Sequence, residues 1–345
     1  MSDINIRLEG RAGRITLTRP HALNALSHDM CKAIDTALHL WREDAQAALI
    51  IIDAEGDKAF CAGGDIAELY ETGMRGEFDY GRTFWRDEYR LNALLAGYSK
   101  PVVSFMQGFT MGGGVGIGCH GRHRVVEESS RIAMPECGIG LVPDVGGSYL
   151  LAHAPGHLGV YLGTTAARMD AGDAIFAGFA DHFIPRAQWD DLIQILEASG
   201  DVGHLVSHAQ TPPEASLKSR LPEIDRLFDA PALSGILDRL AADDSPFARD
   251  TLAIMQRNSP LAMACAIEII RSLQAETPDM YRALRMEYRY THRAMQQGDF
   301  LEGIRAAIID KDRNPQWKFA DQPVPQEAID RMLAPLGAEG LKFET

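Results

Sequence analysis

The sequence predicts an α/β protein in which an α/β core is followed by a mainly helical C-terminal region. Three features of the sequence carry this prediction. Short apolar runs suited to buried strands alternate with helix-length segments over about the first 200 residues. Glycine-rich turns follow two of these runs. Beyond residue 200 the apolar residues recur almost wholly at helical spacing.

The first elements follow from local patterns. Two alternating segments, residues 4–8 and 14–18, flank a glycine-containing turn and are typical of a hairpin. Ser27 is a good N-cap for a helix that runs to about Trp41 with one apolar face. Further elements are expected at residues 48–54 (buried strand), 84–95 (helix), 102–106 (buried strand), 124–126 and 132–134 (short strands).

The C-terminal part begins after a breaker cluster at residues 211–214. Ser259 and Pro260 are an N-cap and a proline at the first helical position, so they predict the start of an apolar helix. Residues 281–297 and 300–309 continue in helical period.

These patterns divide the chain of 345 residues at a single point. Residues 1–200 are expected to form the α/β core. Residues 201–345 are expected to form a mainly helical region that completes a site or an oligomer interface. A chain of this length can bury a core without disulfides or a structural metal.

Composition excludes several classes of protein. With 34 basic and 48 acidic side chains the formal net charge is −14, which argues against a nucleic-acid binder. The five cysteines form no C-x-x-C pair and fit a reducing compartment. The uncharged run over residues 102–119 contains six glycines, so we expect no membrane helix. No targeting leader is recognisable, and we expect a cytoplasmic protein.

A glycine cluster over residues 111–121 invites a nucleotide-binding interpretation. Gly116, Gly118 and Gly121 match G-x-G-x-x-G. However, residues 122–126 return to strand character and leave no room for the helix that a dinucleotide site needs. A dinucleotide-dependent dehydrogenase is therefore the least favoured interpretation.

Glycines at strand-to-helix junctions can also serve as backbone hydrogen-bond donors to a substrate. Backbone N–H groups without neighbouring side chains can approach a substrate carbonyl closely. A second glycine-rich turn, residues 60–65, follows the strand expected over residues 48–54. The two turns have the composition of an oxyanion hole, and tight backbone packing without a catalytic role explains the glycines equally well.

Two carboxylates stand alone in a stretch poor in charge. Between Ile132 and Ala167 the only formally charged side chains are Glu136 and Asp144. Such a segment is expected to be buried, and buried carboxylates often mark functional sites because burial disfavours their charge. Each also has a structural explanation: Glu136 in the first turn of a helix, and Asp144 as the cap of a helix through Leu151.

Other catalytic arrangements find little support. No G-x-S-x-G nucleophile elbow is present. Two histidine pairs have the i, i+4 spacing of metal ligands, namely His153 with His157 and His204 with His208. A Pro-Gly step interrupts the first pair and the second has no acidic residue between its members, so we expect no metal. His120 is expected to be a core histidine or a supporting hydrogen-bond donor.

With these residues in place, the chain resembles the crotonase, or enoyl-CoA hydratase/isomerase, superfamily. Residues 60–65 and 111–114 are similar to the two oxyanion-hole loops of that family. The resemblance implies a ββα-repeat spiral core that binds an acyl-CoA and carries the chemistry. It implies that the N–H groups of Gly64 and Gly113 hold the thioester oxygen. It places Gly64 and the carbonyl of Ala62 beside the CoA, with Ala62 near the adenine.

The resemblance also shows departures from the hydratases. Hydratases carry two catalytic glutamates; Gly116 stands at the position of the first, whereas Glu136 keeps the second. Asp144 replaces a glycine of the hydratase Pro-Gly-x-Gly-Gly turn. Both departures are similar to the 3-hydroxyisobutyryl-CoA hydrolase branch, which shares the run at residues 133–147.

Other segments are similar to the same branch. Residues 85–92 resemble a motif whose glutamate, here Glu88, contacts substrate. Residues 286–289 and 309–317 are similar to the branch's C-terminal helices. The resemblance covers most of the chain and is weakest over about residues 200–245.

The branch implies a thioesterase that converts 3-hydroxyisobutyryl-CoA to 3-hydroxyisobutyrate and CoA in valine breakdown, without cofactor or metal. Glu136 would attack the thioester or activate water, Asp144 would orient the substrate hydroxyl or the water, and Glu88 would help close the site. Gly113 would contact substrate through its N–H group. An enoyl-CoA hydratase or isomerase and a non-catalytic acyl-CoA-binding regulator stay open as alternatives, as does the oligomeric state, a homo-oligomer included.

Overall fold

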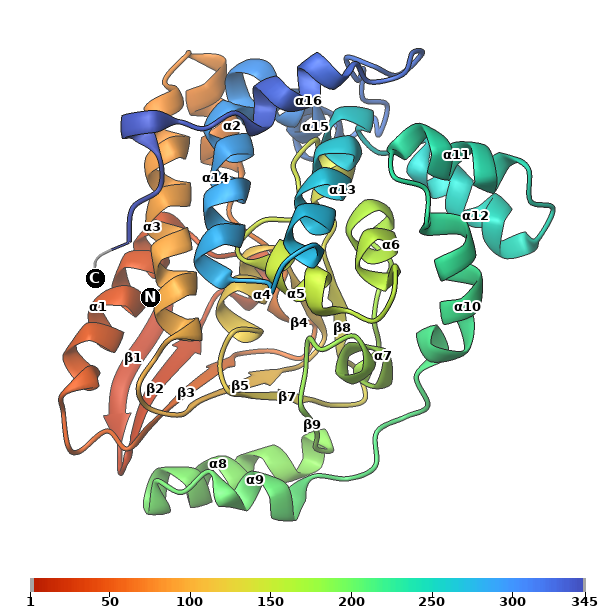
Figure 1. Cartoon of the computed structure of the whole chain (residues 1–345). Helices are drawn as coiled ribbons and strands as arrows, with labels where there is room; N and C mark the ends of the chain where they lie inside the picture. The colour runs from red at the N-terminus through yellow and green to blue at the C-terminus, as the bar shows by residue number, and fades with distance from the viewer. Residues whose placement is uncertain (1–2, 344–345) are drawn as a thin grey trace. The chain divides into compact units, whose positions relative to one another are not determined.

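The computed structural model describes residues 3–343 and has an α/β architecture (Figure 1). The chain forms two compact units. Unit 1 comprises Met1–Asp65, Asp87–Ala133 and Arg168–Lys218, and unit 2 comprises Ile66–Arg86, Met134–Ala167 and Ser219–Thr345. Each unit takes three stretches of chain, whereas the sequence patterns suggested one division near residue 200. The roles assigned to the two parts stay predictions.

Unit 1 contains a six-stranded sheet in the order β1-β2-β3-β5-β7-β9. The hairpin expected at the start of the chain is present, because β1 and β2 pair antiparallel, and the remaining neighbours pair parallel. The strands are β1 (Ile4–Glu9), β2 (Ala12–Leu17), β3 (Leu49–Ala54), β5 (Val102–Met106), β7 (His123–Val126) and β9 (His182–Phe183).

A second sheet of three parallel strands also belongs to unit 1. Its strands are β4 (Ala59–Cys61), β6 (Phe109–Met111) and β8 (Arg131–Ala133). Sequence periodicity missed β4 and β6, because three residues are too few to establish an alternation. Each of these two strands leads directly into a glycine-rich turn.

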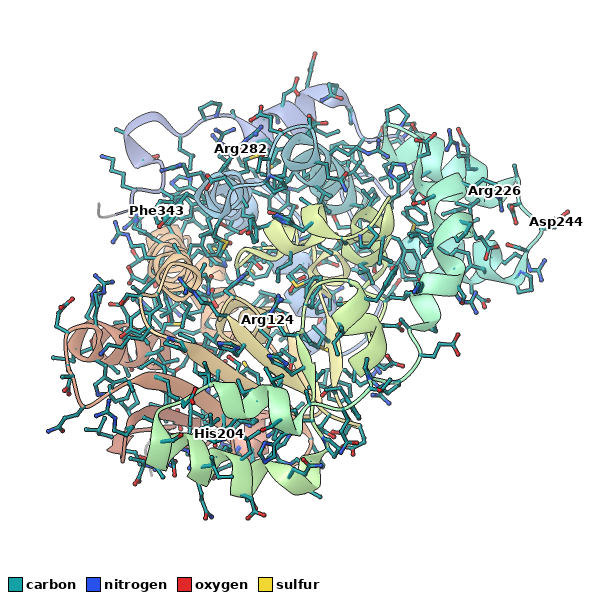
Figure 2. All side chains as sticks on the ribbon, turned by 60° about the horizontal axis from the view of Figure 1, so that its bottom comes forward. Arg124, His204, Arg226, Asp244, Arg282 and Phe343 are labelled. Atoms are coloured by element: carbon teal, nitrogen blue, oxygen red, sulfur yellow. The ribbon has the colours of Figure 1, made fainter. Side chains whose placement is uncertain are left out.

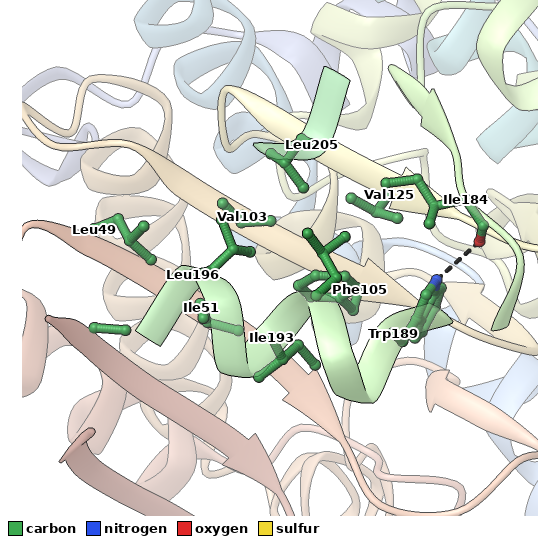
Figure 3. Packing of buried hydrophobic residues seen from close by; sticks show 12 residues of the cluster. Leu49, Ile51, Val103, Phe105, Val125, Ile184, Trp189, Ile193, Leu196 and Leu205 are labelled. Atoms are coloured by element: carbon green, nitrogen blue, oxygen red, sulfur yellow. Dashed lines mark hydrogen bonds between the residues drawn. The ribbon is translucent and has the colours of Figure 1, made fainter. Parts of the chain in front are cut away.

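Helices cover the larger sheet of unit 1. Helices α8 (Trp189–Ser199) and α9 (Gly203–His208) lie along one face of it, where their apolar side chains pack on the strands (Figure 3). Trp189 anchors this core: its ring meets Phe105 edge-on at 5.1 Å between centroids, and its Nε1 donates to the Ile184 carbonyl at 2.8 Å.

The remaining helices of unit 1 are short apart from α1 (His28–Arg42). The expected N-cap of α1 is confirmed, because the Ser27 side chain accepts from the Met30 N–H. The other two are α4 (Gly113–Gly118) and α7 (Ala171–Phe176). Helix α3 (Phe78–Ala96) runs from unit 2 into unit 1 and is longer than the sequence predicted.

Unit 2 is built from helices, among which α13 (Pro260–Gln274) packs against α5, α6 and α14. Its predicted start is confirmed: Ser259 Oγ accepts from the Ala262 N–H, with Pro260 next in the chain. The other helices of unit 2 are α2 (Ala67–Met74), α5 (Gly147–His153), α6 (Leu158–Thr165), α11 (Leu233–Ala241), α12 (Pro246–Met255), α14 (Met280–Gln297), α15 (Phe300–Ile304) and α16 (Gln326–Leu333).

Two further features differ from simple expectation. Helix α10 (Ser216–Phe228) accommodates Pro222 within its length. The helix expected over residues 300–309 is α-helical only to Ile304 and continues as a π-helix over Arg305–Ile309. Among the described helices, none has the length and apolar composition needed to cross a bilayer.

Candidate active site

The two glycine-rich turns of unit 1 are held by backbone contacts. The segment after β4 pairs with residues preceding α1: Leu26 N–H donates to the Gly63 carbonyl and Asp65 N–H donates to the Leu26 carbonyl, both at 2.9 Å. Gly63 adopts φ of 124° and Gly112 adopts φ of 47°. Side chains are disfavoured at such angles, so glycine is required at both bends.

The two turns approach each other so closely that side chains would not fit between them. A Cβ atom on Gly114 would lie 2.1 Å from the Cys61 carbonyl oxygen. A Cβ atom on Gly113 would lie 3.4 Å from the Gly64 nitrogen and 2.9 Å from Glu88 Oε1. Unit 1 therefore brings together Gly64, Gly113 and Glu88, while the roles that the resemblance gives them stay predictions.

The N–H groups of Gly64 and Gly113 are available as hydrogen-bond donors. Neither donates a hydrogen bond to another residue within the described part of the chain. Gly113 is the first residue of α4, where a helix offers no internal acceptor for the N–H group. Two free donors in adjacent turns have the chemistry of an oxyanion hole.

Ala62 lies in the same turn and is partly buried. Its N–H donates to the Leu23 carbonyl at 3.0 Å, which fixes this peptide against the loop before α1. The proximity of its carbonyl to CoA stays a prediction.

Glu88 is a buried carboxylate, with 2% of its surface exposed. It lies on α3, one residue after Asp87, whose Oδ2 is 2.7 Å from His28 Nε2. Burial raises the pKa of the Cys61 thiol to about 12, and the nearby Glu88 carboxylate adds to the shift. Since Cys61 stays protonated at neutral pH, it is a poor nucleophile although it precedes the glycine turn.

Glu136 and Asp144 both lie in unit 2 and are each 4% exposed, so the predicted burial of this charge-poor stretch is confirmed. Glu136 occupies the first turn of a short 3-10 helix, Glu136–Ile139, in agreement with its structural explanation. The end of this turn is closely packed: Tyr290 Oη donates to the Gly140 carbonyl at 3.0 Å. A Cβ atom on Gly303 would lie 2.2 Å from the Ile139 carbonyl oxygen.

Asp144 is not the cap of α5, so that alternative explanation is wrong. The N-cap residue is Gly146, which has no side chain with which to cap the helix. The chain makes a turn between Asp144 and the helix, with two successive positive φ angles, 53° at Val145 and 79° at Gly146, so the helix starts two residues later than a cap at Asp144 would require. A β-branched residue is strained in this conformation. Strain at a buried carboxylate turn is typical of functional sites.

Glu287 holds this turn and was missed as a site residue in the sequence. Its Oε2 accepts from the Gly146 N–H at 2.8 Å, and its Oε1 accepts from the Ser148 N–H at 3.1 Å and from the Ser148 hydroxyl. Glu287 is fully buried in α14. Burial raises its pKa to about 8, and the Asp144 carboxylate contributes to the increase.

A sequence signal for Glu287 does exist. It occupies the apolar face of α14, and the residues at helical spacing from it, Ala283, Tyr290 and Ala294, are all buried. An acidic residue on an otherwise buried face needs a polar partner, which here is the turn after Asp144.

The histidines are the remaining candidates for metal ligands or for a supporting role. His120 is 8% exposed and lies just after α4. Within residues 3–343, no three His, Cys, Asp or Glu side chains are grouped as a metal ion would require.

Comparisons with known proteins identify the family of the chain. The family model described as enoyl-CoA hydratase/isomerase matches residues 12–333. The 3-hydroxyisobutyryl-CoA hydrolases, mitochondrial, of Gallus gallus and Rattus norvegicus are 37% and 38% identical to this chain, covering 99% of it and 91% of each relative.

Two solved structures are similar over their full length. An enoyl-CoA hydratase from Rhodobacter sphaeroides 2.4.1 is 55% identical with a TM-score of 0.95, and the match covers 99% of this chain and 100% of that one. A carnitinyl-CoA dehydratase from Mycobacterium thermoresistibile is 36% identical with a TM-score of 0.94, covering 100% and 99%. The fold implied by the resemblance is thus confirmed, and the chain belongs to the enoyl-CoA hydratase/isomerase family of the crotonase superfamily.

Proposed function

We propose that this member of an acyl-CoA enzyme family is a thioesterase that hydrolyses 3-hydroxyisobutyryl-CoA to 3-hydroxyisobutyrate and CoA. The main support is that Glu136 and Asp144 are both buried. In addition, Gly116 occupies the position at which hydratases carry a catalytic glutamate. Without that glutamate, addition of water across a double bond lacks one of its usual acid–base groups. The names of curated relatives 37–38% identical to the chain add to this support.

The chemistry needs an oxyanion hole and one activated oxygen nucleophile. The N–H groups of Gly64 and Gly113 would stabilise the negative charge that develops on the thioester oxygen. Removing one such donor typically raises the barrier by about 2.7–4 kcal/mol. Both donors belong to the backbone, so this contribution does not depend on pH.

Glu136 would act in one of two ways. As a nucleophile, its carboxylate forms a bond to the thioester carbon while the C–S bond breaks. The CoA thiolate then leaves and takes up a proton, and water hydrolyses the resulting anhydride. As a general base, Glu136 instead removes a proton from the attacking water. Incorporation of oxygen-18 from water into the Glu136 carboxylate would distinguish the first route from the second.

Asp144 and Glu88 would position the substrate. A 3-hydroxyacyl chain offers one hydroxyl group, which a buried carboxylate can bind as acceptor. The strained turn around Asp144 and its support by Glu287 suit a side chain that must hold one fixed position. Glu88 would contact the substrate beside the Gly113 donor.

Hydratase or isomerase activity is the second candidate, because a solved structure 55% identical to this chain carries the name enoyl-CoA hydratase. The deciding experiment measures thiol release from 3-hydroxyisobutyryl-CoA and, in parallel, hydration of crotonyl-CoA. We expect thiol release, and a loss of about a thousandfold or more in Glu136→Gln, since the variant lacks the reacting carboxylate.

The matched control is Asp190→Asn, which removes one exposed negative charge on α8 and should retain full activity. Hydration without thiol release would favour the second candidate. Full activity of Glu136→Gln would contradict the proposed catalytic role. Tight acyl-CoA binding without turnover of any thioester would identify a non-catalytic regulator.

A further inference from the structure

Helix α14 carries a stripe of four arginines in a protein whose net charge is −14. The positions are Arg282, Arg285, Arg289 and Arg293, and this spacing places them along one side of the helix. Arg282 and Phe343, which mark this part of unit 2, are labelled in Figure 2. Concentrated positive charge of this kind is unfavourable unless an anion compensates it.

A cavity of about 330 Å³ lies between this stripe and the C-terminal segment, within unit 2. Arg285 and Arg289 line it from α14, and Lys342 lines it from the other side. The rest of the lining consists of leucine, proline and glycine residues from residues 335–341. The charged part of the lining is therefore entirely positive.

The arginines of the cavity differ from their neighbour Arg282 in their partners. Arg282 forms an ion pair with Glu276. Within residues 3–343, no carboxylate lies within ion-pair distance of Arg285 or Arg289. Burial lowers the pKa of Arg289, and the positive charge of Arg282 lowers it further. Glu339, the acidic residue of the adjoining segment, instead lies 3.5 Å from His292 Nε2.

Several contacts hold α14 against the C-terminal segment beside the cavity. Arg293 Nη1 donates to the carbonyl oxygens of Met332 and Ala334 at 3.1 and 2.9 Å. Arg289 Nη1 donates to the Leu333 carbonyl at 3.3 Å. The Arg285 guanidinium stacks 5.2 Å from the centre of the Phe343 ring. A cavity preorganised in this way loses little entropy when it binds a ligand.

We propose that this cavity binds a phosphate group. Two guanidinium groups and an ammonium group line one cavity and match the negative charge of a phosphate, which arginine binds through N–H donors. The phosphate belongs either to the CoA part of the substrate or to a separate anion. Only the first source rests on the proposed function.

The test of binding uses the full-length protein and inorganic phosphate. Thermal unfolding is followed in phosphate and in chloride at equal ionic strength, and phosphate and adenosine 3′,5′-bisphosphate are titrated by calorimetry. The double variant Arg285→Gln/Lys342→Gln is compared with Arg226→Gln/Arg239→Gln, which removes two positive charges elsewhere in unit 2.

We expect phosphate to stabilise the wild type and the control, because a ligand that binds only the folded state raises Tm. In the cavity variant the affinity should fall about tenfold or more, as expected when charge-assisted hydrogen bonds are lost. Equal binding by both double variants, or no binding by the wild type, would overturn the proposal. Neither Tm nor the calorimetric affinity requires enzyme activity. A protein that binds phosphate but does not hydrolyse the thioester would therefore contradict the proposed function and leave this proposal standing.

Kinetics then identify the source of the phosphate. If the cavity holds a phosphate of the substrate, the cavity variant should raise KM about tenfold for the acyl-CoA and leave the acyl-pantetheine unchanged. If it holds a separate anion, KM for both thioesters is unchanged while phosphate binding is lost. An equal rise of KM for both thioesters, with phosphate binding intact, would contradict both sources.

Discussion

The glycine turns of unit 1 and the carboxylate turn of unit 2 present their functional groups in opposite ways. In unit 1 the groups are the backbone N–H donors of Gly64 and Gly113, and a Cβ atom on Gly113 would lie only 3.4 Å from the Gly64 nitrogen. In unit 2 the functional groups are carboxylates, and the turn that follows Asp144 is held by hydrogen bonds to the buried side chain of Glu287. The geometry of the first region depends on the absence of side chains at its glycines. The geometry of the second depends on charge and hydrogen bonding.

This difference predicts how each region responds to change. Added atoms should damage the glycine turns, because a Cβ atom on Gly113 or Gly114 would lie 2.1–3.5 Å from its nearest neighbouring atoms. The carboxylate turn should instead respond to pH, since Glu287 has a pKa raised to about 8 by burial. The following substitutions test this contrast.

The largest effect is expected for Gly113→Ala. Its new Cβ would lie 2.9 Å from Glu88 Oε1 and 3.4 Å from the Gly64 nitrogen, between the two proposed oxyanion donors. The backbone N–H of residue 113 is kept, but the added methyl group crowds it. We expect kcat/KM for thioester hydrolysis to fall by about a hundredfold or more, which is comparable to the loss of one oxyanion donor. The measurement is thiol release under steady-state conditions, with Tm recorded in parallel.

The control for this prediction is Gly203→Ala in unit 1. There the added Cβ would meet only the end of the exposed Asp201 side chain, at 3.1 Å. We expect activity close to wild type. A Gly113→Ala enzyme that keeps more than a third of wild-type activity would show that the space between the turns is not used by substrate.

Glu287→Gln tests the carboxylate region through the pH dependence of stability. In the unfolded chain this carboxyl group ionises near pH 4.5, whereas in the folded protein it keeps its proton to about pH 8. Between these values the unfolded state releases a proton that the folded state retains. The free energy of unfolding of the wild type therefore falls as pH rises through this window, by a few kcal/mol.

The variant lacks this titration, so its response to pH should be flatter. At pH 5 it should be less stable than wild type by about 1–3 kcal/mol, because a glutamine cannot accept from Gly146 and Ser148 with both terminal atoms. At pH 8 the difference should narrow or reverse. Urea unfolding at pH 5, 6.5 and 8 measures both effects, with Glu268→Gln on the exposed side of α13 as control. A difference that does not change with pH would refute the assignment of a protonated Glu287.

Much of the fold was accessible from the sequence where one local signal sufficed. Ser27 capped α1, Ser259 and Pro260 opened α13, and the absence of charge around Glu136 and Asp144 indicated their burial. These features depend on neighbours in the chain. Patterns of this kind survive folding because tertiary contacts reinforce them.

Other features depend on distant residues and were not predictable. Strand β4 exists because it pairs with β6, and β6 pairs in turn with β8; three residues alone cannot signal either pairing. Asp144 looked like a helix cap, but the left-handed turn at Val145 and its hydrogen bonds to Glu287 decide the geometry. Gly146, which donates to Glu287, lies 141 positions from it in the chain.

Asn24→Ala should affect stability more than chemistry. Asn24 is 1% exposed, and its Nδ2 donates to the carbonyl oxygens of Glu55 and Ala59, at 3.0 and 2.9 Å. Alanine leaves both buried carbonyls without this partner, at a cost of about 2–4 kcal/mol in the free energy of unfolding.

Asn24 also has φ of 54°. Asn24→Gly removes the same bonds without that strain and should be more stable than Asn24→Ala by about 1 kcal/mol. Identical stabilities would mean that the backbone relaxes.

Asp65→Asn is expected to have the smallest effect and tests whether the glycine turn works through its backbone alone. The Asp65 carboxylate pairs with Arg19 at 3.1 Å but is 38% exposed, so its loss should lower stability by less than about 1 kcal/mol, and by less at high salt. The Asp65 N–H, which donates to the Leu26 carbonyl, is unchanged by the substitution. Thiol release should therefore stay within about twofold of wild type. If activity fell at least tenfold with stability unchanged, the charge of Asp65 would itself contribute to catalysis. The contrast between a region specified by space and one specified by charge would then no longer hold.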